Sequence, residues 1–239
     1  MISDEAIRQH AVRNQTSEEN VVREYVQCAF LGCLYRQRGS EHLLFKGGTA
    51  LRLAYQSPRY SEDLDYTASD LTLAEAEGLV RKALGELRRE GVDLSVSESK
   101  ATSGGYLMVL EGAAGRFPSR ILVNISLRSG KIKGEAVLIT NPLAPAYTAY
   151  LLPEGRLAGE KIDALLSRKK PRDFFDVYFL ARKGVARREM SERKESLKKE
   201  TSRLENKKAA MELKSFLPQS FWPTIRNLRE NLLKELERL

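Results

Sequence analysis

The chain reads LLFKGGTALRLAYQSPRYSEDLDY from Leu43 to Tyr66, and this stretch decides the fold. The apolar residues 43–45 indicate a short buried strand, and Gly47 and Gly48 make a turn directly after it. Residues 49–54 then have the apolar spacing of a helix. Because glycine has no Cβ atom, backbone N–H groups at such a turn can approach an anion closely. We therefore expect a phosphate at the N-terminus of this helix.

Two carboxylates follow the glycine turn at alternate positions. If Leu64 and Tyr66 belong to a buried strand, Asp63 and Asp65 project together from its other face. Two hard oxygen ligands suit Mg²⁺, with Mn²⁺ as a substitute, because this ion keeps several waters and is completed by substrate phosphates. A plain turn and a solvated strand face explain each motif taken alone. Their order and closeness instead predict metal-assisted chemistry on a nucleoside triphosphate, with Asp63 and Asp65 as the metal ligands.

Length and composition agree with a cytoplasmic enzyme. The 239 residues, 42% of them hydrophobic, can bury a large core. No apolar run approaches the roughly 20 residues of a membrane span, and the first residues lack the features of a secretory signal. Cys28 and Cys33 lie in an apolar helical stretch, so we expect core thiols and no disulfide. A zinc site is not expected, since His10 and His42 have no ligand spacing around them.

The net charge of +8 favours a phosphate-bearing partner such as RNA or a nucleotide. Much of the excess lies late in the chain, in a group of cations interleaved with glutamates. These cations are Arg187, Arg188, Arg193, Lys194, Lys198, Lys199, Arg203, Lys207 and Lys208. Mixed charges at helical spacing also describe an ordinary exposed helix held by side-chain pairs. Contact with RNA and a purely structural role therefore both remain open for this segment.

Hydrophobic periodicity predicts the order of the remaining elements. The expected elements are helices over 18–38 and 71–89 and strands over 92–96, 106–110 and 121–127. From residue 153 onward the whole chain has a helical pattern. We expect an α/β domain with a mixed sheet over residues 1–152, followed by a helical C-terminal domain over residues 153–239.

Two motifs in the helical region carry charged residues at helical spacing. A helix over 154–167 places Lys161 on one side, and Pro171 ends it and opens the next helix. Asp173 and Asp176 then share a face of that second helix. Simpler explanations exist for two of them: Asp173 favours a helix N-terminus and can form a salt bridge with Arg172, and a lysine on an amphipathic helix can reach out to solvent.

Four motifs resemble the AbiEii-type nucleotidyltransferases, which are toxins of type IV toxin–antitoxin systems, related to the MenT toxins and more distantly to the DNA polymerase β superfamily. The motifs are Phe45 to Leu51, Arg59 to Tyr66, Gly159 to Arg168 and Lys170 to Tyr178. The resemblance implies a polymerase β-like domain that transfers a nucleotide to an acceptor hydroxyl. It also implies the 3′ end of a tRNA as acceptor and an AbiEi-like antitoxin encoded nearby.

The resemblance further implies roles for single residues. The active-site lysine of the family falls on Lys161, and an active-site aspartate falls on Asp173 or Asp176, of which we favour Asp176 for a direct role. The catalytic candidates are thus Asp63, Asp65, Lys161 and Asp176. The nucleotide-binding candidates are Lys46, Gly47, Gly48, Thr49, Arg59, Ser61, Lys161 and Asp173.

One position departs from the superfamily pattern. A third carboxylate usually completes the metal site from a later strand, and Asn124 occupies the corresponding place here. An amide carries no charge and cannot help deprotonate a hydroxyl. Three options stay open: another acid serves, the metal site has only two carboxylates, or catalysis is slow or lost. A transferase for proteins or small molecules and a catalytically silent nucleotide- or RNA-binding protein are therefore the alternative functions.

Overall fold

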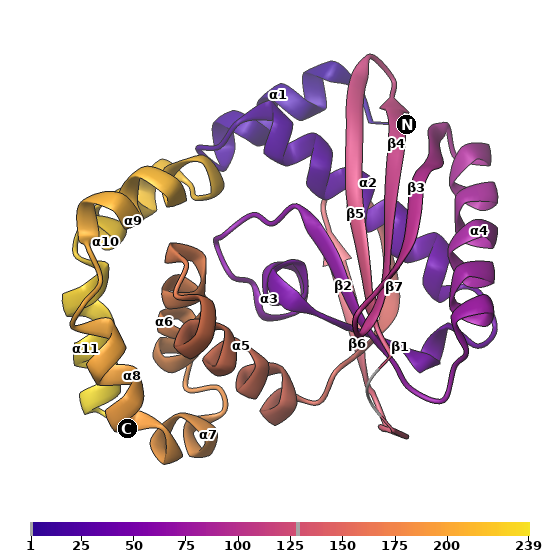
Figure 1. Ribbon diagram of the computed structural model, residues 1–239. Helices are drawn as coiled ribbons and strands as arrows, with labels where there is room; N and C mark the ends of the chain where they lie inside the picture. Colours follow the sequence, from indigo (N-terminus) through magenta and orange to yellow (C-terminus); the bar gives the residue numbers. More distant parts are fainter. Residues whose placement is uncertain (1, 128–129) are drawn as a thin grey trace. The chain divides into compact units, whose positions relative to one another are not determined.

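A computed structural model describes residues 2–127 and 130–239 as two compact units (Figure 1). The first, which we call the sheet unit, comprises Tyr60–Leu152 and the chain before it up to Gln56. The second, the helical unit, comprises Pro153–Leu239 together with the short segment Ser57–Arg59. That segment is far in sequence from the rest of its unit, and no local pattern indicates its assignment.

The sheet unit contains a mixed sheet, as predicted. In the described residues its strands are β1 (Leu43–Lys46), β2 (Asp63–Ala68), β3 (Val92–Thr102), β4 (Gly105–Ala114), β5 (Phe117–Ser126), β6 (Glu135–Asn141) and β7 (Ala144–Leu151). Their order is β3-β4-β5-β2-β1-β7-β6. Strand β2 runs parallel to β5 and β1 runs parallel to β7, whereas the other neighbours are antiparallel. Strands β1 and β2, which carry the opening motif, therefore lie near the centre of the sheet.

Helices cover the sheet on both sides. The helices of this unit are α1 (Asp4–Arg13), α2 (Glu18–Tyr35), α3 (Gly47–Tyr55) and α4 (Leu73–Arg89). Helix α2 packs against β5 and β7 and α4 packs against α2 and β3, while α3 contacts β2. Figure 1 shows α3 and α4 on opposite sides of the strands. A capping box at Thr72 and Glu75 fixes the start of α4, two residues later than the periodicity predicts.

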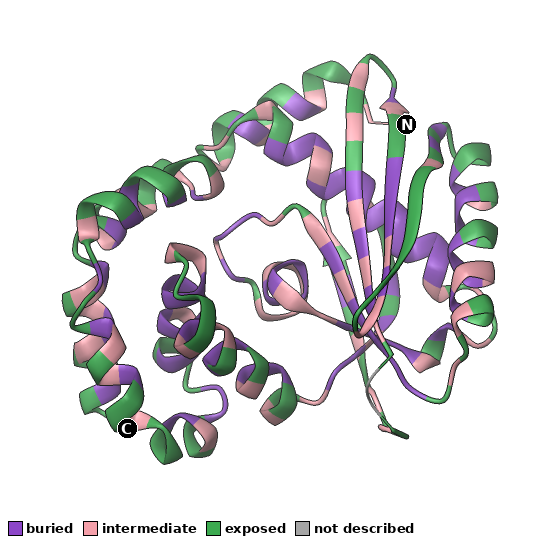
Figure 2. Ribbon diagram, viewed as in Figure 1, coloured by how far each residue is buried: buried purple, intermediate pink, exposed green. Residues whose placement is uncertain are grey.

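Helix α1 and strands β6 and β7 were not predicted from the sequence. Strand β7 begins close to Pro142 and contains Pro145, and proline ordinarily counts against a strand. The proline is tolerated because it lies in the irregular part of the β6–β7 pairing, where the described register gives it no partner strand residue. Strand β3 also extends beyond the predicted residues 92–96, and its second half is exposed (Figure 2), so it has no hydrophobic alternation to reveal it.

The core of the sheet unit forms from the predicted apolar positions. Phe45 and Tyr66 are fully buried on neighbouring strands, with ring centroids 5.6 Å apart. Cys28 and Cys33 are buried free thiols, as expected. Burial raises the pKa of Cys28 strongly and that of Cys33 to about 12, so both stay protonated and take part in packing.

The helical unit confirms the prediction of a helical C-terminal region. Its helices are α5 (Glu154–Arg168), α6 (Pro171–Lys183), α7 (Arg187–Glu192), α8 (Lys194–Thr201), α9 (Asn206–Leu213), α10 (Trp222–Arg226) and α11 (Leu228–Glu237). Helix α6 packs against α5, α9 and α11 and is the most buried of them. Pro171 opens α6, and Gly184, with a φ of 74°, ends it.

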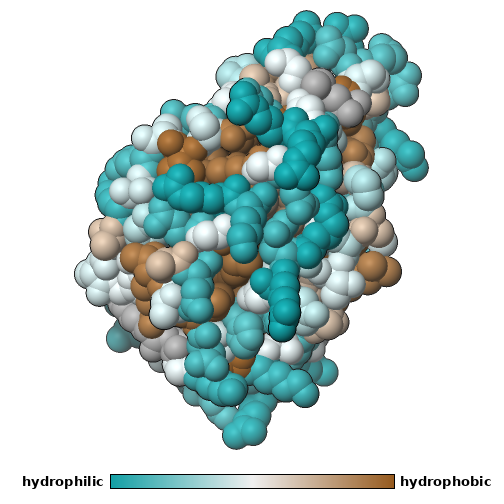
Figure 3. Space-filling view, turned by 90° about the vertical axis from the view of Figure 1, so that its right-hand side faces the viewer, coloured by the Kyte–Doolittle hydropathy of each residue, from teal (hydrophilic) through white to brown (hydrophobic). Residues whose placement is uncertain are grey.

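The surface is largely polar. Figure 3 views the molecule from the side of α4, where hydrophobic areas are separate from one another and surrounded by hydrophilic side chains. Within the described residues, no helix combines the length and the apolar character that crossing a membrane requires.

The pairing of β3 with β4 can be tested at Gly112. A Cβ atom there would lie 1.9 Å from the carbonyl oxygen of Asp93 on β3. We expect Gly112→Ala to lower the free energy of unfolding by about 1–3 kcal/mol, because the strands must move apart. Gly85→Ala is the control: a Cβ on this exposed face of α4 meets nothing within 4 Å, and the change should stabilise by about 0.4–1 kcal/mol. Urea denaturation measures both, and an unchanged Gly112→Ala variant would contradict this strand pairing.

Candidate active site

The carboxylates of the opening motif lie on one face of β2, as predicted. Leu64 and Tyr66 are fully buried, whereas Asp63 and Asp65 are partly exposed. The strand register places Asp65 opposite Lys46 on β1 and opposite Asn124 on β5. A lysine, a carboxylate and an amide thus form one row across three neighbouring strands.

Asn124 is the direct neighbour of Asp65. Its side-chain nitrogen donates a hydrogen bond to Oδ1 of Asp65 at 3.0 Å. An amide at this position supports the carboxylate without adding a second negative charge beside it. Among the described residues, no group of three or more His, Cys, Asp or Glu side chains is arranged to hold a metal ion. The described part of this row of strands therefore contributes the two carboxylates Asp63 and Asp65.

Gly47 is required by the position of Asp65. Its φ of 80° is left-handed, and a Cβ atom there would lie 2.1 Å from Oδ2 of Asp65. Any other residue would collide with the carboxylate. The N-terminus of α3 therefore directly adjoins the acidic pair, and in the described residues no side chain caps its first turn. Free N–H groups at a helix start are a site for an anion.

The hydroxyl of Thr49, one of the nucleotide-binding candidates, has a partner within the fold. The side chain is buried, and its Oγ1 donates a hydrogen bond to the backbone oxygen of Asp63 at 2.5 Å. This bond joins the first turn of α3 to the start of β2. The hydroxyl hydrogen is thus used within the fold, and the backbone N–H is the group of Thr49 that suits a phosphate.

The loop before β2 is held by residues that the sequence analysis did not select. Gln27 of α2 donates from Nε2 to the backbone oxygens of Ser61 and Glu62, at 3.0 and 3.2 Å. The guanidinium of Arg52 lies over the ring of Tyr60, 3.9 Å from its centroid. These contacts fix the approach to Asp63. A buried glutamine in an apolar helix was the available signal for Gln27.

In the helical unit, Asp176 is the centre of a buried ion network. Its two oxygens accept hydrogen bonds from Nε and Nη2 of Arg59, at 2.8 and 2.9 Å, and from Nζ of Lys161 at 2.7 Å. Burial alone would raise the pKa of Asp176, but the two cations outweigh it and lower the pKa to about 2. The carboxylate is therefore ionised and holds both Arg59 and Lys161 in place.

Asp173 has its own partner. Its carboxylate is fully buried and accepts from Nε and Nη2 of Arg168, the shortest contact being 2.6 Å. It also accepts from the backbone N–H of Lys170 at 3.1 Å, at the start of α6. The partner is thus Arg168 and not the adjacent Arg172. Asp173 joins the end of α5 to the beginning of α6.

The candidate residues fall into two groups, each gathered within its own unit. The sheet-unit group consists of Lys46, Gly47, Gly48, Thr49, Ser61, Asp63 and Asp65, with Asn124 beside them. The helical-unit group consists of Arg59, Lys161, Asp173 and Asp176. Arg59 is close in sequence to the first group, yet its side chain belongs to the second.

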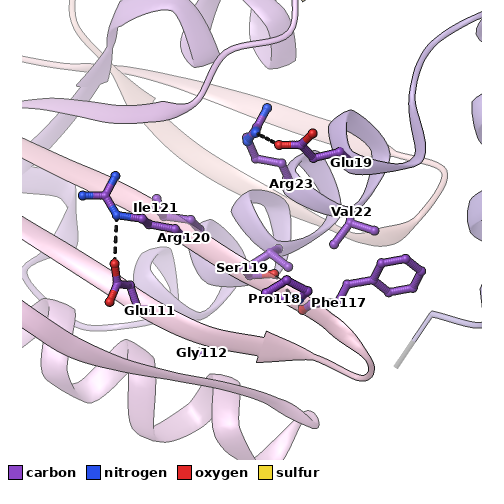
Figure 4. A pocket seen from close by; sticks show the side chains of 11 residues that line it. Glu19, Val22, Arg23, Glu111, Gly112, Phe117, Pro118, Ser119, Arg120 and Ile121 are labelled. Carbon is purple, nitrogen blue, oxygen red and sulfur yellow. Dashed lines mark hydrogen bonds and ion pairs between the residues drawn. The ribbon is translucent and has the colours of Figure 1, made fainter.

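A pocket also lies near the turn of the β4–β5 hairpin, and its lining differs from that of the candidate site. It measures about 620 Å³ and lies between α2 and the hairpin (Figure 4). Its charged residues already form ion pairs, Arg120 with Glu111 and Arg23 with Glu19, and apolar side chains such as Val22 and Phe117 line the rest. It contains none of the candidate residues.

A mixed sheet that presents two alternate carboxylates beside a glycine turn at a helix start is consistent with a nucleotidyltransferase of polymerase β-like fold. The particular family follows from comparison of the sequence. Residues 29–238 match the family described as nucleotidyl transferase AbiEii toxin, type IV TA system, and the chain belongs to this family. It is therefore a nucleotidyltransferase toxin of a type IV toxin–antitoxin system, which uses a nucleoside triphosphate and has an antitoxin as its counterpart.

Solved structures share the fold. MenT4, a nucleotidyltransferase toxin from Mycobacterium tuberculosis H37Rv, has a TM-score of 0.64 at 16% identity, covering 100% of this chain and 91% of that one. JHP933 from Helicobacter pylori has a TM-score of 0.59 at 21% identity, covering 93% and 95%. A putative nucleotidyltransferase from H. pylori has the same TM-score and identity, covering 93% and 98%. No curated protein sequence matches the chain.

The Asp176 network predicts a large effect on stability. Asp176→Asn leaves two buried cations without their counter-charge, so we expect the free energy of unfolding to fall by about 3–5 kcal/mol in urea denaturation. Asp163→Asn is the control in the same unit, because its ion pair with Arg193 is exposed and should contribute no more than about 1 kcal/mol.

The difference in free energy of unfolding between wild type and Asp176→Asn should depend on pH. The pKa of Asp176 is lower in the folded chain, about 2, than its ordinary value of 3.8. Its stabilising contribution is complete above the ordinary value and is lost as the pH falls through the folded value. The stabilities of wild type and Asp176→Asn should therefore converge between pH 4 and pH 2, and a constant difference across this range would contradict the ionised network.

Proposed function

We propose that the protein transfers a nucleoside monophosphate from a nucleoside triphosphate to the 3′ end of a tRNA in a Mg²⁺-dependent reaction, and that blocking tRNA in this way makes it toxic. The observation that carries the proposal is the position of Asp65 against Gly47 at the start of α3, with Asp63 on the same face of β2. A cation held by these carboxylates would lie beside an anion at the helix start, as a metal-bound triphosphate requires.

The residues fit a hard divalent cation. Asp63 and Asp65 present carboxylate oxygens on one partly exposed strand face, so water and phosphate oxygens can supply the remaining ligands. Mg²⁺ prefers such a site, and Mn²⁺ can replace it. When bound, the ion would neutralise charge on the α-phosphate and on the oxygens that attack and leave. The backbone N–H groups of Gly48 and Thr49 would hold the outer phosphates, with Lys46 beside them.

The reaction then balances as a simple displacement. The acceptor hydroxyl oxygen forms a bond to the α-phosphorus, the bond from this phosphorus to the bridging oxygen breaks, and pyrophosphate leaves while the hydroxyl proton passes to solvent. Lys161 is proposed as a catalytic cation. Both oxygens of Asp176 are already bonded to Arg59 and Lys161, so we propose that Asp176 acts by holding these cations in place. Asp173 would support Arg168 in the same manner.

The distribution of charge supports an RNA acceptor. Of the 40 Lys and Arg residues, 23 lie in residues 57–59 and 153–239, against 14 of the 32 Asp and Glu residues. The helical unit therefore has a formal charge of +9, and the remainder, with 17 against 18, has −1. Exposed cations with no ion-pair partner in the described part of the chain include Arg156, Lys199, Lys207, Arg226 and Lys234. A polyanion such as tRNA is the partner that such a unit attracts.

Labelled nucleotides test the activity. The protein is incubated with each α-labelled triphosphate, Mg²⁺ and total tRNA, and label on tRNA is expected. Asp63→Asn or Asp65→Asn should lower the rate by about 10²–10³-fold or more, because the metal-bound phosphate loses its support. Asp93→Asn, the same change at an exposed position on β3, should keep the wild-type rate.

Chelation by EDTA should stop the reaction and added Mg²⁺ restore it. Label on protein would instead favour a protein acceptor, and no label at all would favour a silent binding protein.

Charge variants test the RNA acceptor. Lys199→Gln with Lys207→Gln removes two cations from α8 and α9, and should weaken tRNA binding and lower the slope of log K against log salt by about 2. Lys82→Gln with Arg89→Gln removes the same charge from exposed positions on α4 in the sheet unit and should change neither quantity. Binding is measured by filter retention over a range of salt concentrations. Equal effects of the two pairs would contradict a dedicated role of the helical unit.

A further inference from the structure

A small pocket opens beside Asp65 within the sheet unit. It measures about 270 Å³. Lys46, Asp65 and Asn124 form one part of its wall, and the β3–β4 turn at residues 102–105 forms another. Tyr66, Tyr106, Ile125 and Ser126 complete the lining. The volume is slightly below the roughly 300–1,000 Å³ of pockets that enclose whole small molecules, so this pocket suits one terminal group of a larger molecule.

The two sides of Asp65 are not equivalent. On the β1 side, Gly47 and the start of α3 adjoin Oδ2 of Asp65, and this is the side where phosphates can bind. On the β5 side, Asn124 donates to Oδ1. The strand order β4-β5-β2-β1 then places the pocket's turn and Tyr106 beyond Asn124, away from α3. The carboxylate therefore separates a phosphate side from a pocket side.

Displacement at phosphorus requires this kind of separation. The attacking and leaving oxygens lie roughly in line on opposite sides of the α-phosphorus. If pyrophosphate leaves on the α3 side, the acceptor hydroxyl must arrive from the Asn124 side. We propose that the pocket binds the 3′-terminal nucleoside of an RNA acceptor and directs its hydroxyl toward the α-phosphate. The proposal rests on the nucleotidyl transfer described above.

The lining of the pocket has the chemistry of a nucleoside site. Hydroxyl groups come from Thr102, Ser103 and Ser126. Hydroxyls can pair with a ribose or with the edge of an unpaired RNA base. The side-chain oxygen of Asn124 can accept a hydrogen bond from the incoming hydroxyl without removing its proton, which gives the neutral residue a function in orienting the acceptor.

Ser126 offers a matched pair of variants. Ser126→Leu fills the pocket from β5, and Ser119→Leu makes the same change on the same strand at the other end, where the residue is equally half-buried. We expect Ser126→Leu to raise the KM for tRNA at least about tenfold while the Kd for the triphosphate, measured without acceptor, stays within about twofold. Ser119→Leu should change neither, and urea denaturation should show both variants folded. Unchanged KM in Ser126→Leu, or a weakened Kd for the triphosphate, would overturn the assignment.

A direct probe separates this proposal from the activity on which it rests. An RNA oligonucleotide with a photoreactive thio-nucleoside at its 3′ end, lacking the 3′ hydroxyl, is irradiated with the protein, Mg²⁺ and a triphosphate. The cross-link should map to residues 102–106 or 124–126. A cross-link there without any transfer to tRNA by the wild type would refute the proposed reaction and leave the pocket assignment intact. Transfer with a cross-link elsewhere would refute the pocket alone.

Discussion

The position of the Asp65 carboxylate is the constraint on which the rest of the sheet unit depends. One oxygen faces the backbone of Gly47, and the other accepts a hydrogen bond from Asn124. These contacts require one register across β1, β2 and β5, because a slip by one residue would turn Asp65 into the core and Tyr66 out of it. Fold and site therefore obey the same requirement: the register that buries Leu64 and Tyr66 also exposes the acidic pair beside the helix start.

The helical unit is organised by the complementary arrangement, a buried anion held by cations. Asp176 lies on the most buried helix of this unit and binds Arg59 and Lys161 together. Buried ion pairs contribute little net stability, since desolvation offsets their attraction, but they are strict about geometry. This network fixes the position of the Lys161 ammonium, whereas the ammonium of a flexible surface lysine would have no fixed position. It also recruits the segment Ser57–Arg59 into the helical unit.

Charge is divided between the two units in a way that suits the tasks proposed for them. The sheet unit is close to neutral and contains the two candidate carboxylates, whereas the helical unit has all of the excess positive charge. Carboxylates need to remain available for a cation, and a polyanion needs an extended basic surface. Placing these properties in different units lets each act without cancelling the other.

The sequence by itself determined the local pieces: the strand, glycine turn and helix from Leu43 onward, the alternate aspartates, and the two helices around Pro171. Their signals are short-range, arising from side-chain period, missing Cβ atoms and a fixed proline φ. Only the tertiary structure decided the partners. Asn124 meets Asp65 across 59 residues, Arg59 meets Asp176 across 117, and Gln27 holds the backbone of Ser61. The hydroxyl of Thr49 likewise has a backbone partner that its motif does not reveal. Such pairings depend on how distant segments pack, and no local pattern encodes that packing.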